Sequence, residues 1–102
     1  MSSRIRVQLW DHITRELNLS SQTKLLLLVI ANYTDARSLK AHAPLSLLIL
    51  RTGLREPEAT HLLDILAASE YVRRSQPPVT NSLPIPLYDL RERLVRDALR
   101  NP

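Results

Sequence analysis

The side chains that could do chemistry gather around Gly53, which is the only glycine in the chain. Arg51 and Arg55 flank this glycine, and Thr60 and His61 follow it. A guanidinium group binds phosphate or the edge of guanine, while hydroxyl and imidazole groups donate hydrogen bonds to bases or phosphates. The chemistry that suits this set of residues is contact with nucleic acid.

Carboxylates lie among these donors and weaken the case for nucleic-acid contact by the segment around Gly53. Glu56 and Asp64 could accept a hydrogen bond from cytosine, but they also repel the phosphate backbone. Further candidates for phosphate contact lie outside the segment, at Lys40, Arg73 and Arg74. Arg73 and Arg74 fit equally well as ordinary solvated charges on a strand.

Catalysis and metal binding find little support. Glu58, His61 and Asp64 recur at a spacing of three and could share one helix face, but without cysteine or a second placed histidine the ligand set falls short. A histidine among carboxylates on an exposed helix is far more often an ordinary surface residue. A single glycine also cannot form a phosphate-cradling loop. We therefore predict that the chain is not an enzyme and has no catalytic residue, metal or cofactor.

Two helices must position the candidate residues on either side of Gly53. A lone glycine between two apolar periodic segments indicates a residue with positive φ. Pro57 suits a first helical position with Glu56 as its cap, and the second helix should end near Ser69–Glu70. We predict a helix-turn-helix over residues 45–70, with buried stripes at Leu45, Leu48, Ile49 and Thr52 and then at Ala59, Leu62, Leu63 and Leu66.

A small antiparallel sheet is predicted around this pair of helices. Tyr71–Arg74 combines β-favouring residues with two cations. Residues 83–87 alternate apolar side chains with prolines, which suits an edge strand that pairs with Tyr71–Ser75 in a hairpin over residues 71–87. Residues 76–82 would form the tip of this hairpin. A short first strand is predicted over Leu39–Ala43.

An N-terminal helix and a core helix are predicted before the sheet. Apolar residues recur every four positions over residues 4–17 and predict an amphipathic helix. Residues 21–34 predict a second helix, capped by Ser20 or Ser21, whose middle is apolar on every side. Such a helix must be covered on all sides, by the N-terminal helix, a C-terminal helix or a second subunit.

The C-terminal segment predicts one more helix, over residues 88–100. Asp89 followed by Glu92 resembles the start of a capping box, with Asp in place of the hydroxyl residue. One stripe of this helix is apolar, and arginines alternate with acidic residues on its other faces. We predict a homodimer whose interface uses the apolar residues of both terminal helices, Leu9, Ile13, Leu90, Leu94 and Leu99.

Three features resemble one known family: the turn Thr52-Gly53-Leu54, the buried stripe of the helix that follows it, and the exit Tyr71–Arg74. They are similar to the winged helix-turn-helix domains of bacterial and phage replication initiators and transcriptional regulators, over about residues 20–87. That family has basic residues at the start of the second helix and a glycine before the wing strand. This chain has Glu56-Pro57-Glu58 and Glu70 at those positions.

The resemblance implies a fold class and a function. The fold would be mainly α with a small antiparallel β wing, extended by N- and C-terminal helices. The function would be binding of double-stranded DNA as a replication-associated or transcriptional regulatory protein. The acidic start of the second helix and the apolar terminal helices also fit an alternative, in which the domain docks or assembles with another protein of such a complex without strong DNA binding.

Length and composition predict the number of domains, the charge of a partner and the location of the chain. A chain of 102 residues predicts one domain over residues 1–102. Its 14 basic and 10 acidic residues give a net charge of +4, and all but two of the basic residues are arginine, which favours an anionic partner such as DNA. The longest apolar run, Leu25–Ala31, is too short to span a membrane, and the N-terminal residues do not form an export signal. We expect a cytoplasmic location.

Overall fold

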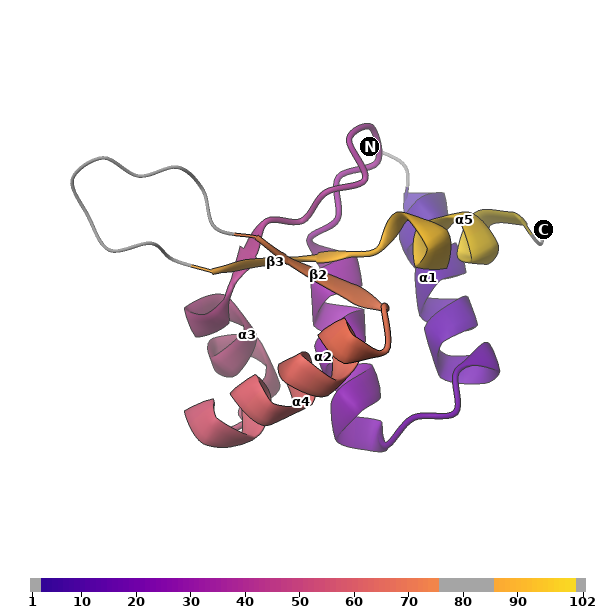
Figure 1. Ribbon diagram of the computed structural model, residues 1–102. Helices are drawn as coiled ribbons and strands as arrows, with labels where there is room; N and C mark the ends of the chain where they lie inside the picture. Colours follow the sequence, from indigo (N-terminus) through magenta and orange to yellow (C-terminus); the bar gives the residue numbers. More distant parts are fainter. Residues whose placement is uncertain (1–2, 76–85, 101–102) are drawn as a thin grey trace.

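Two helices separated by a left-handed glycine form the predicted helix-turn-helix. The computed structural model of the chain describes residues 3–75 and 86–100 (Figure 1). Helix α3 (Leu45–Thr52) and helix α4 (Glu56–Ala68) are joined through Gly53, which has a φ of 75°. The N–H group of Gly53 donates to the carbonyl of Ile49 at 2.9 Å and ends α3. The positive φ predicted from the single glycine is confirmed.

The start of α4 differs from the sequence prediction. Arg55 occupies the cap position instead of Glu56, and its side chain makes no capping hydrogen bond because a guanidinium has no acceptor. Pro57 therefore lies at the second helical position. Glu56 and Glu58 fall in the first turn, where carboxylates stabilise the positive end of the helix dipole.

Helix α4 ends in a Schellman motif with an unusual residue. Ser69 is the C-cap, and the next residue, Glu70, has a φ of 63°. The N–H of Tyr71 donates to the carbonyl of Leu66 at 3.0 Å, and the N–H of Glu70 donates to Ala67 at 3.1 Å. This is the position at which the winged domains described above carry a glycine. The glutamate accordingly holds a backbone conformation that costs roughly 1 kcal/mol for a residue with a side chain.

The described residues form one antiparallel sheet of three short strands in the order β1-β3-β2. Strand β1 is Ala43–Pro44, β2 is Val72–Ser75 and β3 is Leu87–Leu90. Leu90 pairs with Val72 and Leu87 pairs with Ser75. The predicted contribution of residues 83–85 to a strand, and the predicted tip over residues 76–82, lie outside the described residues.

Two boundaries of the sheet correct the sequence predictions. Residues 88–90 belong to β3, so the predicted helix over residues 88–100 is α5 (Glu92–Arg100) and begins four residues later. The predicted first strand over Leu39–Ala43 is limited to β1, because Leu39 and His42 have positive φ values of 61° and 49° and cannot extend a strand.

Asp89 explains both corrections. The sequence predicted this residue as a helix cap, yet it lies in β3 and is 2% exposed. Its Oδ1 accepts hydrogen bonds from the backbone N–H groups of Ala41 and His42, the latter at 2.7 Å. The ring Nδ1 of His42 lies 3.5 Å from Oδ2. The carboxylate therefore holds the loop before β1 in its non-extended shape and satisfies two backbone donors.

A second aspartate shapes the start of the same loop. The Oδ2 atom of Asp35 accepts from the N–H of Ser38 at 2.8 Å and from that of Arg37 at 3.0 Å. These hydrogen bonds stabilise the carboxylate, and they lower the pKa of Asp35 below its usual value, the bond from Ser38 contributing most. The loop is thus fixed at both ends by aspartate side chains.

Helix α2 (Ser21–Asn32) forms the core and is covered on most sides, although Leu25 is 36% exposed. Ser20 caps it, with Oγ accepting from the N–H of Thr23 at 3.3 Å. Helix α1 (Ser3–Glu16) packs on one side, and α3, α4 and β3 pack on the others (Figure 1). The predicted helices over residues 4–17 and 21–34 are confirmed within two residues at each end. The core includes Leu26, Leu27, Ile30, Leu48, Leu63, Leu66, Val72 and Val95.

The residues predicted to form an oligomer interface are covered within the single chain. Leu9, Ile13, Leu90 and Leu94 are between 0% and 4% exposed, and Leu99 is a half-buried residue packed against the same core. Helix α1 packs against α2 and α5 within the single chain, so these side chains cover one another and are not available to a second subunit.

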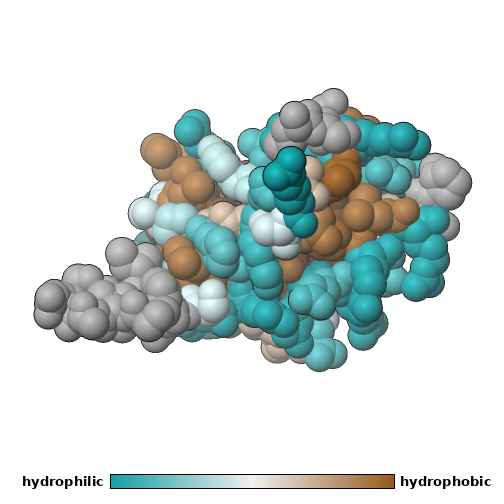
Figure 2. Space-filling model, turned by 90° about the horizontal axis from the view of Figure 1, so that it is seen from above, coloured by the Kyte–Doolittle hydropathy of each residue, from teal (hydrophilic) through white to brown (hydrophobic). Residues whose placement is uncertain are grey.

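Other apolar side chains do reach the surface. The large exposed ones include Trp10 at 39%, Ile65 at 42% and Leu50 at 71%. Figure 2 shows one face on which hydrophobic side chains are visible between stretches of hydrophilic ones. No helix among the described residues is long and apolar enough to cross a membrane.

Candidate nucleic-acid interface

The outer face of α4 brings three of the predicted residues together. Ala59 and Leu63 are fully buried and fix the inner face of this helix. Arg55 and His61 are therefore exposed, and Thr60 is half-buried at the edge of the buried stripe. These side chains follow one another along the start of α4, which lies below the sheet in the view of Figure 1. They form a surface that a duplex could approach.

Strand β2 separates the two arginines that the sequence placed side by side. Successive side chains of a strand point to opposite faces of the sheet. Val72 is buried against the core, so Arg74 points to the same face as Val72 and Arg73 points away. Both arginines are exposed, but they do not lie on the same surface.

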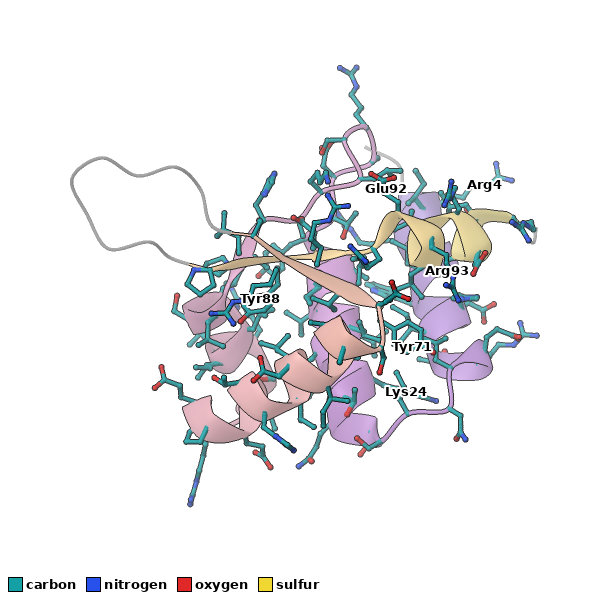
Figure 3. The ribbon with its side chains drawn as sticks, viewed as in Figure 1. Arg4, Lys24, Tyr71, Tyr88, Glu92 and Arg93 are labelled. Atoms are coloured by element: carbon teal, nitrogen blue, oxygen red, sulfur yellow. The ribbon has the colours of Figure 1, made fainter. Side chains whose placement is uncertain are left out.

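Arg74 lies on the side of the sheet that faces α4. It pairs with Tyr88 across β2 and β3, and Tyr88 is 2% exposed (Figure 3). Burial raises the pKa of the Tyr88 hydroxyl above its usual value, the charge of Arg74 opposes that shift, and the charge of Asp64 adds to it. Helix α4 packs against β2, so Arg74 lies on the face of the sheet that is turned toward α4.

This arrangement connects β2 to the predicted surface of α4. Asp64 lies three residues after His61 and four after Thr60, and residues at those spacings are neighbours on a helix. Thr60, His61 and Asp64 thus form one continuous region of α4, with Arg55 at the start of the same helix and Arg74 on the sheet face that is turned toward it. We call these five residues the α4 surface.

Arg73 lies in a different environment. It lines a groove of about 270 Å³ with Glu70, Arg91, Glu92 and Arg93, where β2 approaches the start of α5. The guanidinium of Arg91 lies 3.4 Å from the carboxylate of Glu70. Figure 3 shows Arg93 on α5, away from Tyr88. Arg73 therefore sits among balanced charges, outside the α4 surface.

Arg51 and Lys40 also lie away from the α4 surface. Arg51 lines a groove with residues of α1 and α2, including Trp10 and Tyr33. Lys40 is half-buried in the loop before β1, and its carbonyl accepts from the N–H of Asp35 at 2.9 Å. Figure 1 shows that loop above the sheet, on the opposite side from α4. Of the seven predicted residues, the structure brings together Arg55, Thr60, His61 and Arg74.

Acidic residues lie among the cationic and hydrogen-bond-donating residues on the outer face of α4. Glu56 and Glu58 are exposed in its first turn, where a phosphate would otherwise meet the positive end of the helix. Glu58 is turned toward the start of α2, since Gln22 Nε2 donates to its Oε2 at 3.4 Å. Glu56 and Asp64 are therefore the carboxylates that a ligand approaching the outer face would meet.

Sequence reasoning missed the part played by Tyr88. Its pairing with Arg74 depends on the register of β2 and β3, whereas the sequence prediction placed Tyr88 at the start of the helix over residues 88–100. The signal that could have located it is the apolar Leu87 followed by the β-favouring Tyr88 directly after Pro86, which suits a strand as well as a helix.

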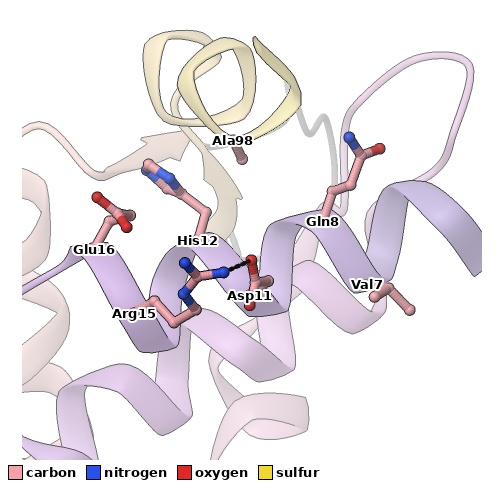
Figure 4. A pocket seen from close by; sticks show the side chains of 7 residues that line it. All are labelled: Val7, Gln8, Asp11, His12, Arg15, Glu16 and Ala98. Carbon is pink, nitrogen blue, oxygen red and sulfur yellow. Dashed lines mark hydrogen bonds and ion pairs between the residues drawn. The ribbon is translucent and has the colours of Figure 1, made fainter. Parts of the chain in front are cut away.

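A groove between α1 and α5 holds further titratable groups but no chemical site. It has a volume of about 350 Å³, and the side chain of Arg15 forms an ion pair with Asp11 at 3.0 Å (Figure 4). His12 and Glu16 lie along the same groove. Within residues 3–75 and 86–100, no group of three histidine or acidic residues is placed to hold a metal ion.

Comparison with known proteins supports the fold. No family model matches the chain, and neither does any curated protein. The chain is similar to the crystal structure of RV1404 from Mycobacterium tuberculosis, with a TM-score of 0.59 and 22% sequence identity. The match covers 96% of this chain and 61% of that one, so the chain spans about three-fifths of the length of its structural neighbour. The likeness at this identity concerns the fold alone.

Proposed function

We propose that the chain is a winged helix-turn-helix protein that binds double-stranded DNA in replication or transcriptional regulation. In this proposal α4 is the recognition helix and the β2–β3 pair is the wing. The observation that supports it is the α4 surface, in which α4 exposes Arg55 and His61 and packs against the sheet face that carries Arg74. A helix in the major groove and a flanking cation on the phosphates is the usual division of such an interface.

Each residue of the α4 surface has a separate role in this proposal. Arg55, at the start of α4, addresses guanine or a phosphate, and Thr60 and His61 donate to base edges. Arg74 contacts the phosphate backbone beside the groove. Asp64 accepts from the exocyclic amine of cytosine and disfavours a phosphate at the same place. The surface thus combines one phosphate anchor with a short reading helix.

A second candidate function is supported by the acidic first turn of α4. Glu56 and Glu58 stand where a DNA-reading helix would favour cations, and exposed Ile65 lies on the same helix at 42% exposure. A basic partner protein would complement this surface better than a phosphate backbone would. In that case the domain docks a protein and lacks strong affinity for DNA.

Selection from a random duplex library distinguishes the two. The proposal expects enrichment of a short motif by the parent chain, and a relaxed motif at one position for Arg55→Ala, since that residue addresses bases. An inverted repeat in the motif would indicate that two copies bind together. Absence of enrichment, with recovery of a protein whose binding depends on Glu56 or Glu58, would assign the surface to docking.

A further inference from the structure

Three helices border a groove that the proposed DNA contact does not use. Helix α1 contributes Trp10, α2 and its C-cap contribute Val29 and Tyr33, and α3 contributes Arg51. The groove has a volume of about 430 Å³, within the range of roughly 300–1,000 Å³ that small-molecule sites occupy. Its complete lining is Trp10, Thr14, Leu28, Val29, Asn32, Tyr33 and Arg51.

The groove is mainly apolar, with Thr14, Asn32 and Arg51 as its polar lining residues. Trp10 is 39% exposed, although a large aromatic side chain is normally covered when a partner is available within the chain. Leu28 and Val29 are half-buried and form the apolar wall beside it. Thr14 does not add a free donor, because its hydroxyl already donates to the carbonyl of Trp10 at 2.8 Å.

Arg51 is the one charged side chain that lines this groove. It is exposed, and it forms no ion pair or side-chain hydrogen bond with any residue in the described part of the chain. A guanidinium that lines an otherwise uncharged, mainly apolar groove favours a ligand with a carboxylate at one end, because the planar fork binds both oxygens at once. A neutral or cationic ligand would leave that charge without a partner.

We propose that this groove binds a small aromatic carboxylate. The ring of the ligand packs against Trp10 and Val29, and its carboxylate pairs with Arg51. This proposal does not depend on the proposed DNA binding, since Arg51 lies outside the α4 surface. It assigns to Arg51 a ligand contact in place of the phosphate contact expected from the sequence.

Trp10 provides a direct readout, because it is the only tryptophan in the chain. Phenylbutyrate added to the full chain should change the tryptophan emission in a saturable manner, with a dissociation constant at or below about 1 mM for a ligand of this size. Phenylbutanol, which has the same ring and chain length without the charge, should bind about tenfold more weakly, since it lacks the charge-assisted pair.

Variants locate the site. Arg51→Gln should weaken phenylbutyrate binding about tenfold and leave phenylbutanol binding unchanged, whereas Arg51→Lys should retain part of the preference for the carboxylate. Arg96→Gln is the matched control, because Arg96 is an exposed arginine on α5 that does not line the groove, and it should bind like the parent.

Three results would overturn the proposal. The first is equal affinity of the parent for phenylbutyrate and phenylbutanol, or no emission change up to about 10 mM, which exceeds any useful affinity. The second is parent-like phenylbutyrate binding by Arg51→Gln. The third is Trp10 emission that depends on protein concentration together with dimer formation in sedimentation, since a second copy would then occupy the groove.

Discussion

Replacing Arg74 with alanine should weaken binding to duplex DNA by an amount that depends on salt. A cation that neutralises one phosphate releases about 0.9 counterion from B-form DNA. Removing that cation therefore lowers the logarithm of the association constant K by about 0.9 times the negative logarithm of the salt concentration. The expected loss is about eightfold at 0.1 M monovalent salt and about fourfold at 0.2 M. The slope of log K against log salt should become less steep by about 0.9.

Arg73→Ala is the matched control for this prediction. It removes the same side chain from the adjacent residue, but from the opposite face of β2, where Glu70 and Glu92 lie in the same groove. Its salt slope should equal that of the parent. Arg73→Ala and Arg74→Ala each remove one positive charge, so a difference between their salt slopes cannot come from the net charge of the chain.

Fluorescence anisotropy of a labelled duplex, measured over a series of salt concentrations, provides both slopes. Arg74→Gln should reproduce the effect of Arg74→Ala, which excludes a change in strand stability as the cause. Equal slopes for the parent and Arg74→Ala would show that Arg74 does not contact phosphate. Equal reductions for the Arg73 and Arg74 variants would refute the placement of the two residues on different surfaces.

Four further predictions concern the fold, and equilibrium unfolding in urea checks each. Asp89→Ala should lower the free energy of unfolding by about 3 kcal/mol, since two backbone N–H groups lose a charged acceptor. Asp97→Ala on the surface of α5 should change it by less than about 0.5 kcal/mol. Similar losses in the two variants would contradict the role of the buried carboxylate. Glu70→Gly should be more stable than Glu70→Ala by about 1 kcal/mol, because both lose the side chain but only glycine relieves the positive φ, and a less stable glycine variant would contradict this. Leu94→Ala should cost about 3 kcal/mol and Leu94→Arg should unfold the chain, because this residue packs in the core; a folded Leu94→Arg monomer formed from a dimeric parent would restore the interface. Burial raises the folded pKa of Tyr88, so its contribution to the free energy of unfolding is complete below the usual pKa of 10.0 and is lost as pH rises through the folded pKa. Tyr88→Phe should therefore reduce the fall in stability above pH 10. An unchanged fall would contradict the shift.

The helices around Gly53 were predictable because local chemistry determines them. A single glycine between two apolar stripes fixes a positive φ, and the stripe of Ala59, Leu63 and Leu66 fixes which face of α4 is buried. The direction of Arg55 and His61 follows from that face. This part of the α4 surface was therefore accessible from the sequence.

The sheet was less predictable because long-range contacts determine it. Asp89 resembles a helix cap locally, but its carboxylate binds two backbone donors that lie 47 and 48 residues earlier. No periodicity records that contact. The resulting register also decides that Arg74 faces α4 and Arg73 does not, so the sequence could not separate two adjacent arginines of the same type.

The predicted oligomer interface shows the same limit for apolar surfaces. An apolar stripe indicates that a face is buried, but it does not say whether the cover is another part of the chain or a second copy. Leu9 of α1 and Leu94 of α5 are buried in the same core of the single chain, because α1 and α5 pack together. Arg51 and Trp10 were likewise brought to one groove only by the packing of α1, α2 and α3.

Titration of a duplex with the parent chain at low salt tests DNA binding by the α4 surface. We predict a complex at micromolar protein whose affinity falls as salt rises, since phosphate contact releases counterions. Absence of any complex at micromolar protein and low salt, or an affinity that does not change with salt, would contradict DNA binding by the α4 surface.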